Sequence, residues 1–134
     1  MNFKYFTNEI DDVHRLIKEC FDIEIDKTNF KLQDNQKLLL LTLDNEVIGM
    51  SMITLKNDPC KNKSSYYLDY ICIRKDYQHN SYGKKMFEKI IEIAKENKID
   101  YIELTSNKDR VFARKLYMSY GMIIKDTDVF IKQL

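Results

Sequence analysis

Glycine and proline are scarce in this sequence of 134 residues, which has three glycines and one proline. Their scarcity argues against linkers and low-complexity segments, so we expect one continuous domain over residues 1–134. No apolar run approaches the ~20 residues that a membrane-spanning helix needs. The first residues lack the long apolar core of a secretion signal, so we expect a cytoplasmic protein with no membrane partner.

Cysteine is also sparse, and no charge sign dominates. Cys20, Cys60 and Cys72 are too widely spaced for a disulfide framework or a C-x-x-C zinc pattern, so we expect a reduced protein with no metal. The 22 basic and 21 acidic residues give a net charge of +1, which argues against a nucleic-acid partner. Apolar residues make up 44% and aromatics 12%, enough for a folded core.

The order of the expected elements indicates a mixed sheet covered by helices. Amphipathic helices are expected over residues 8–21, 82–97 and 110–120, where apolar residues recur along one helical face. The first should have Thr7 or Asn8 as its N-cap. Strands are expected over residues 2–7, 37–43, 46–55, 66–74 and 99–105, with a hairpin turn at Asp44 and Asn45 and an exposed loop over residues 56–64. Two more short strands are expected over residues 122–125 and 129–132.

One segment, from Arg74 to Lys85, has the features of an anion site. Its four basic residues stand against Asp76 alone, a local balance of +3. It lies between a strand and a helix, where unpaired N–H groups and the helix dipole favour an anion. Gly83 lets a ligand approach the backbone closely. The segment is neither a P-loop nor a dinucleotide fingerprint, and a polar loop that binds nothing has the same local pattern.

Three motifs in order make residues 66–122 resemble the GNAT superfamily of acyl-CoA-dependent N-acetyltransferases. Residues 78–83 (QHNSYG) stand where that family has [RQ]-x-x-G-x-[GA], and residues 103–107 (ELTSN) resemble its fifth strand ending in Asn. Residues 113–122 (ARKLYMSYGM) are similar to its A-x-x-[LF]-Y-x-x-x-G-F signature. The resemblance implies a single-domain, GNAT-like α/β (α+β) fold, with a mixed, mostly antiparallel central sheet of about six to seven strands flanked by helices.

Two positions depart from the family pattern. Met122 replaces the usual Phe, which is a soft apolar exchange. Ser81 replaces the first motif glycine. A serine is tolerated there if φ is negative, but a positive φ would strain it and weaken coenzyme binding.

The resemblance implies acetyl-CoA as the acyl donor and an amine as the acceptor. It implies that backbone N–H groups from Gln78 to Lys84 bind the pyrophosphate and that the backbone of residues 71–73 pairs with pantetheine. Asn107 would hydrogen-bond the pantetheine arm, and Ala113 would give the coenzyme room. The implied coenzyme-binding residues are Ile71, Cys72, Ile73, Gln78, His79, Asn80, Ser81, Tyr82, Gly83, Lys84, Asn107 and Ala113.

Two residues are the catalytic candidates. Tyr117 matches the family tyrosine that protonates the departing sulfur, and a phenol with a pKa near 10 suits that role; the alternative is an ordinary core tyrosine. Asp69 stands where many relatives carry a Glu on the fourth strand. It could act as the general base, directly or through a water, or it could hold a loop or a cationic acceptor. Cys72 lacks a His–carboxylate partner chain, so we expect direct transfer without an acetyl-enzyme.

The acceptor is the least defined part. Residues 9–26 hold seven acidic residues against Arg15 and Lys18, a balance of −5. In this superfamily that region lines the acceptor groove, where acidic residues would attract a cationic amine; a solvated helix face or a partner surface looks the same. We expect transfer to the primary amine of a small cationic acceptor. A protein or peptide acceptor and a non-catalytic acyl-CoA-binding module remain alternatives. Relatives often pair through C-terminal strands such as residues 129–132, which suggests a homodimer.

Overall fold

The structure is a computed structural model that describes all residues, 1–134. Five strands form one sheet in the order β1-β2-β3-β4-β5, antiparallel except for the parallel pair β4–β5. This arrangement confirms the mixed, mostly antiparallel sheet flanked by helices. The elements are β1 (Asn2–Tyr5), α1 (Ile10–Phe21), β2 (Gln36–Leu43), β3 (Glu46–Asp58), β4 (Lys63–Ile73), the 3-10 turn η1 (Lys75–Tyr77), α2 (Tyr82–Glu96), β5 (Tyr101–Leu104) and α3 (Val111–Ser119).

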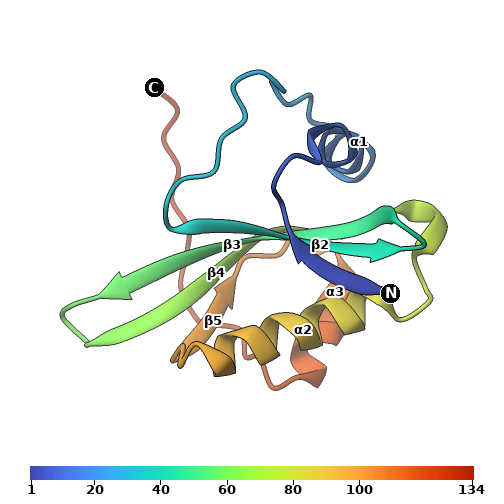
Figure 1. Cartoon of the computed structure of the whole chain (residues 1–134). Helices are drawn as coiled ribbons and strands as arrows, with labels where there is room; N and C mark the ends of the chain where they lie inside the picture. Colours follow the sequence, from blue (N-terminus) through green and yellow to red (C-terminus); the bar gives the residue numbers. More distant parts are fainter.

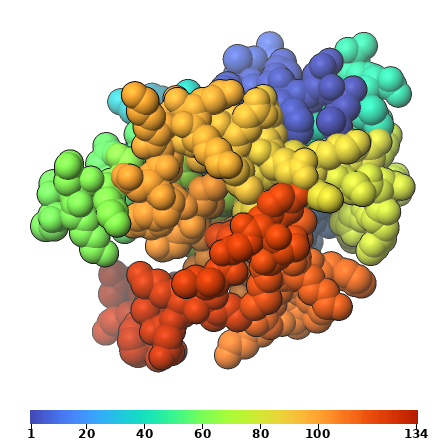
Figure 2. All heavy atoms as spheres, turned by 90° about the horizontal axis from the view of Figure 1, so that it is seen from below, coloured from blue at the N-terminus to red at the C-terminus, as the bar shows by residue number.

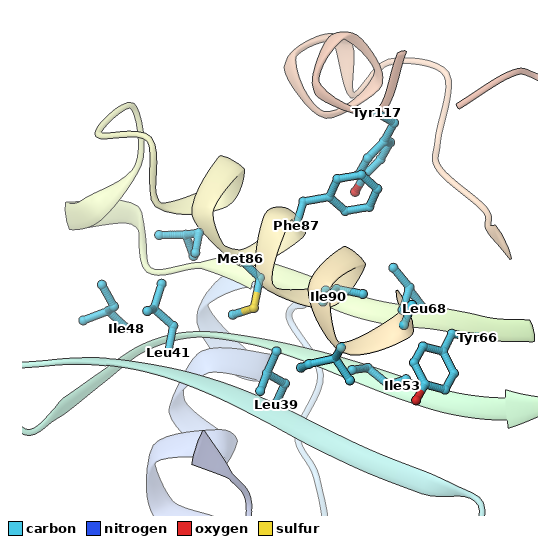
Figure 3. Close-up of a cluster of buried hydrophobic side chains, with 13 residues drawn as sticks. Leu39, Leu41, Ile48, Ile53, Tyr66, Leu68, Met86, Phe87, Ile90 and Tyr117 are labelled. Carbon is cyan, nitrogen blue, oxygen red and sulfur yellow. The ribbon is translucent and has the colours of Figure 1, made fainter. Parts of the chain in front are cut away.

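The helices cover both faces of the sheet. Figure 1 shows α1 on one side and α2 and α3 on the other. In the space-filling view from below, α2 (gold), α3 and the C-terminal tail (both red) cover the lower face (Figure 2). Side chains alternate along a strand, so the leucine run of β2 serves both layers. Leu39 and Leu41 pack under α2, as Figure 3 shows, whereas Leu38 and Leu40 pack under α1.

The sheet has five strands, so the expectation of six to seven was wrong. Residues 122–125 and 129–132 have an apolar pattern but pair with no strand edge, and a strand without a partner leaves its peptide groups unpaired. Over residues 122–132, the only backbone hydrogen bonds run from Met122 N to Tyr117 O and from Thr127 N to Lys125 O. The tail therefore continues as irregular, exposed chain.

Two smaller expectations were also wrong. The loop expected over residues 56–64 is mostly strand, because the polar ends of β3 and β4 keep pairing as far as Asp58 and Lys63. Only residues 59–62 turn there. The helix α1 begins at Ile10, later than a Thr7 or Asn8 cap would start it, and Glu9 takes the N-cap position. The Glu9 carboxylate instead accepts the backbone N–H groups of Thr7 and Asn8, at 2.9 and 3.2 Å.

A bulge in β4 positions the candidate site. Met50 pairs with Cys72 and Met52 with Asp69, so β4 has one more residue than β3 between these pairs. Tyr70 lies in the bulge with a left-handed φ of 52°. Such a bulge bends a strand and increases its twist. Because β5 pairs with β4 only as far as Leu68, the rest of β4 has no partner on that side.

Candidate active site

The open edge of β4 offers peptide groups to an extended ligand. Arg74 N donates to Ile48 O at 2.7 Å, which fixes the phase of the antiparallel ladder between β3 and β4. By the alternation of that ladder, the peptide groups of Cys72 face β3, and those of Ile71 and Ile73 face the open edge. The Ile73 carbonyl already accepts a hydrogen bond from Gln78 Nε2 at 3.0 Å, so the Ile73 N–H and the peptide groups of Ile71 are the ones left for a ligand. An extended chain could therefore pair there as a further strand.

The loop that follows β4 carries six consecutive free backbone N–H groups, those of residues 79–84. The first helical hydrogen bond of α2 is the one from Lys85 N to Ser81 O, at 3.1 Å. A cβ added at Gly83 would meet nothing nearer than Leu116 Cδ2 at 3.9 Å, so the space beside it is open. Free N–H groups and the positive end of a helix dipole together form an anion site. This is the segment that the sequence indicated.

Ser81 has a positive φ, the backbone conformation that we expected to strain a serine at this position. Its φ is 67°, and the φ of His79 is 66°, so both residues lie in the left-handed region. The Ser81 hydroxyl makes no capping hydrogen bond that would offset the strain. The Asn80 side chain lies between them, and its Nδ2 donates to Gln78 O at 3.2 Å and to Tyr77 O at 3.4 Å.

Tyr117 is the buried tyrosine of α3. Only 8% of it is exposed, and its ring centroid lies 5.3 Å from that of Phe87 (Figure 3). Burial raises the pKa of Tyr117, and the positive charge of Arg110 offsets part of that rise. The hydroxyl therefore stays protonated at neutral pH. By contrast, the hydroxyl of Tyr120 donates to Glu88, and burial together with that bond raises the pKa of Tyr120 to about 12.

Asp69 points to the opposite face of the sheet from Leu68, a member of the core cluster that contains Tyr117. Burial raises the pKa of Asp69. The carboxylate borders a groove of about 400 Å³, whose lining also includes Asn35, Thr54, Lys56, Tyr67 and Glu103. Asp69 and Tyr117 thus lie on opposite faces of the sheet.

The structure places the other implied coenzyme residues around the start of α3. Asn107 lies in the turn after β5, with its carbonyl bonded to Arg110 N at 3.1 Å. Ala113 is half-buried on the first turn of α3. The ring centroid of Phe112 lies 5.6 Å from that of His79, so the start of α3 adjoins the loop of residues 78–81. Sequence reasoning did not single out Glu103 or Arg110 individually, because their surroundings depend on which elements lie beside them.

The acidic residues of the first helix and the following loop are mostly paired within that region. The pairs are Asp11 with Lys27, Asp12 with Arg15, Asp22 with Lys18 and Glu24 with His14. Neither Asp69 nor Glu103 makes an ion pair. The unneutralised carboxylates that face a groove are therefore on β4 and β5 and not on α1.

Cys72 is buried, and its hydrogen bond with Cys20 raises the pKa of the Cys72 thiol. A thiol held protonated in this way is a poor nucleophile. No group of three or more His, Cys, Asp or Glu side chains is arranged to hold a metal ion. None of the three helices has the length and apolar character to cross a bilayer.

The family model defines this protein as an acyltransferase. The chain belongs to the acetyltransferase (GNAT) family, whose model matches residues 8–122. Membership implies acetyl-CoA as the acyl donor. No curated protein matches the chain.

Solved structures share the fold over nearly the whole chain. A ribosomal-protein-alanine N-acetyltransferase from Brucella melitensis biovar Abortus 2308 has a TM-score of 0.83 at 14% identity, with 100% of both chains covered. An aminoglycoside acetyltransferase from an uncultured soil metagenomic sample has a TM-score of 0.80 at 16% identity, covering 99% of this chain and 95% of that one. A transcriptional regulator from Bacillus halodurans C-125 has a TM-score of 0.81 at 17% identity, covering 99% and 98%. At such identities the likeness shows the fold and leaves the acceptor open.

Proposed function

We propose that this protein is an N-acetyltransferase that moves an acetyl group from acetyl-CoA directly to the primary amine of a small cationic acceptor. The observation that carries the proposal is the row of six free backbone N–H groups at residues 79–84, beside the open edge of β4. The free amides supply hydrogen bonds to the pyrophosphate. The peptide groups of Ile71 and the N–H of Ile73 pair with the pantetheine arm, which Asn107 and Ala113 border at the start of α3.

Proton transfer is divided between the two faces of the sheet. The Asp69 carboxylate accepts a proton from the acceptor ammonium, directly or through a water, so that the amine is a free nucleophile. As the C–S bond breaks, the Tyr117 hydroxyl donates its proton to the departing thiolate. The new amide nitrogen loses one proton to solvent, and solvent returns one to Tyr117. The positions of Asp69 and Tyr117 on opposite faces keep their proton transfers apart. Bound acetyl-CoA supplies the activated thioester.

The acceptor class follows from the groove beside Asp69. Tyr67 pairs in register with Glu103, so the Cα atoms of Asp69 and Glu103 lie ~8 Å apart on neighbouring strands. Among the lining residues these two carboxylates face one cation, Lys56. A small amine with a second positive group fits this balance, one group at Asp69 and the other at Glu103. The similar structures include an aminoglycoside and a ribosomal-protein acetyltransferase, so they do not choose between small and protein acceptors.

We also propose that two copies associate through the C-terminal tail. The support is the exposure of its apolar side chains, which include Ile123, Val129, Phe130 and Ile131. Monomeric proteins rarely leave a large contiguous apolar surface exposed to water.

The first test is a thermal melt with acetyl-CoA, with dephospho-CoA and ATP as controls. A ligand at about 100 times its Kd adds about 2.7 kcal/mol to the free energy of unfolding, which raises Tm by several degrees in a domain of this size. A shift specific to acetyl-CoA supports the proposal, and no shift at millimolar acetyl-CoA contradicts it. A free-thiol release assay with spermidine, glucosamine and a lysine-containing peptide then identifies the acceptor class. Turnover of the peptide alone would contradict the small-acceptor proposal.

A further inference from the structure

The anion loop, residues 78–81, contains no glycine, although glycine is the residue best suited to its backbone shape. His79 and Ser81 both have left-handed φ values, near 66°, and neither is glycine. A side chain makes that conformation unfavourable, whereas glycine adopts it freely. If nothing held the loop, its free form would leave this conformation for part of the time. A ligand would then bind only the fraction of molecules with the loop correctly shaped, which weakens its apparent affinity.

Asn80 lies between the two strained residues, and its side chain donates hydrogen bonds to carbonyl groups earlier in the same segment. Its Nδ2 donates to the carbonyls of Tyr77 and Gln78, at 3.4 and 3.2 Å. Those carbonyls belong to the peptides just before His79, so the bonds oppose rotation of the chain where it enters the left-handed region. The Gln78 side chain acts in the same direction, because its Nε2 donates to Ile73 O at 3.0 Å and joins the loop to the end of β4.

We propose that Asn80 is a positioning residue for the coenzyme. Its side-chain amide holds the loop of residues 78–81 in the shape that directs the free N–H groups of residues 79–84 outward, and so compensates for serine at position 81. The inference rests on the proposed function, since it assumes that these N–H groups bind the pyrophosphate. It concerns how the loop is shaped, because the Asn80 side chain itself is directed to backbone carbonyls.

The inference predicts coupling between positions 80 and 81, which a double-mutant cycle measures. The Kd of acetyl-CoA is determined by titration calorimetry for the wild type, Asn80→Ala, Ser81→Gly and the double variant. Losing the brace should weaken binding roughly tenfold, about the net effect of one or two hydrogen bonds. Ser81→Gly should bind as tightly as the wild type or tighter. In the double variant glycine removes the strain, so binding should return to within about threefold of the wild type.

Two controls separate this role from a general loss of structure. Asn97 ends the same helix, and its Nδ2 donates to Ile93 O at 2.9 Å, so Asn97→Ala removes a similar bond far from the loop. That variant should bind acetyl-CoA as the wild type does. S-acetylpantetheine, which lacks the pyrophosphate, should bind equally to the wild type and Asn80→Ala in an NMR titration.

The outcomes also distinguish the inference from the function beneath it. If the wild type does not bind acetyl-CoA, the proposed function and the inference both fail. If the wild type binds and Asn80→Ala binds equally well, only the inference fails. It also fails if the double variant remains as weak as Asn80→Ala, or if Asn80→Ala loses affinity for S-acetylpantetheine to the same extent.

Discussion

At the scale of single residues, the Tyr117 hydroxyl is the most direct test of mechanism. Tyr117→Phe removes one oxygen from a buried ring that packs on Phe87. Without its proton the thiolate leaves less readily, so kcat should fall at least ~10-fold, the low end for general acid catalysis. The affinity for acetyl-CoA should stay the same. Single-turnover kinetics, in which chemistry limits the rate, measure the effect.

Tyr120, the C-cap residue of the same helix, provides the matched control. Its hydroxyl is bonded to Glu88, and the pKa of Tyr120 is raised to about 12. Tyr120→Phe should therefore leave kcat nearly unchanged. Equal kcat values for the wild type and Tyr117→Phe would rule out Tyr117 as the acid.

The pKa of Asp69 sets a second expectation, in the pH profile. Burial raises this pKa, so the carboxylate takes up a proton at a higher pH than an ordinary Asp does. A base works only when deprotonated, so activity should fall as the pH drops through the raised pKa. The rise in the pKa of Tyr117 moves loss of the acid to a higher pH than for an ordinary tyrosine. Asp69→Asn should lower kcat and remove the acidic limb of the kcat–pH profile.

Asp128, exposed in the tail, offers a comparison for that experiment. Asp128→Asn should leave both kcat and the acidic limb as they are in the wild type. An acidic limb that persists unchanged in Asp69→Asn would assign the titration to another group.

At the scale of elements, Gly49 controls how closely β3 and β4 approach beside the open edge. A cβ added there would lie 2.6 Å from Ile73 Cδ1 and 3.0 Å from Cys72 O. Gly49→Ala should therefore lower the free energy of unfolding by roughly 1–3 kcal/mol, as overpacking does. It should also weaken acetyl-CoA binding, because Ile73 shifts. Urea unfolding and calorimetry measure the two effects.

Gly83→Ala should behave in the opposite way. A cβ at this position meets nothing within 3.9 Å in the protein, so stability should not fall. The added methyl instead occupies space beside the free N–H groups, so the Kd of acetyl-CoA should rise. Loss of stability in Gly83→Ala, or none in Gly49→Ala, would contradict this assignment of the two glycines.

The elements also show where sequence reasoning works. Helix α2 was predicted within one residue at its C-terminal end, because Met86, Phe87 and Ile90 mark one helical face. The tail strands failed because an alternating apolar pattern identifies a buried face but not the edge with which it pairs. The bulge at Tyr70 was not predicted, since it depends on how β3 and β4 pack together.

The same reasoning applies to the candidate site. The anion segment was found because its charges, Gly83 and its place between a strand and a helix are local features. The sequence left open whether the φ of Ser81 is positive, because only the folded backbone shows it. Glu103 became a neighbour of the Asp69 groove through the parallel register of β4 and β5, which the sequence does not contain.

At the scale of the whole molecule, part of the net charge of −5 over residues 9–26 is offset by cations from outside that segment. Lys4 pairs with Glu9, and Lys27 pairs with Asp11. The charge near a bound ligand therefore depends on which residues the fold brings together, and not on the net charge of one sequence segment. The long-range attraction of α1 for a cationic acceptor is accordingly weaker than the composition suggested.

The C-terminal tail leaves its large apolar side chains exposed to water. Phe130 is 93% exposed, and Val129 and Ile131 are 80% and 82% exposed. In Figure 1 the tail runs from α3 past the sheet toward the side of α1. The sheet also ends at β5, whose outer edge has no partner. Unpaired strand edges and apolar segments are the usual sites of association between chains.

We therefore expect a homodimer at micromolar concentration, measured by sedimentation equilibrium. Phe130→Asp places a charge in the apolar segment and should convert the dimer to a monomer. Thr127→Asp adds the same charge to the same tail at a polar position, so that variant should remain dimeric. A monomeric wild type, or a dimer that survives Phe130→Asp, would rule out the tail as the contact. If the dimer is lost in both variants, net charge and not the apolar contact controls association.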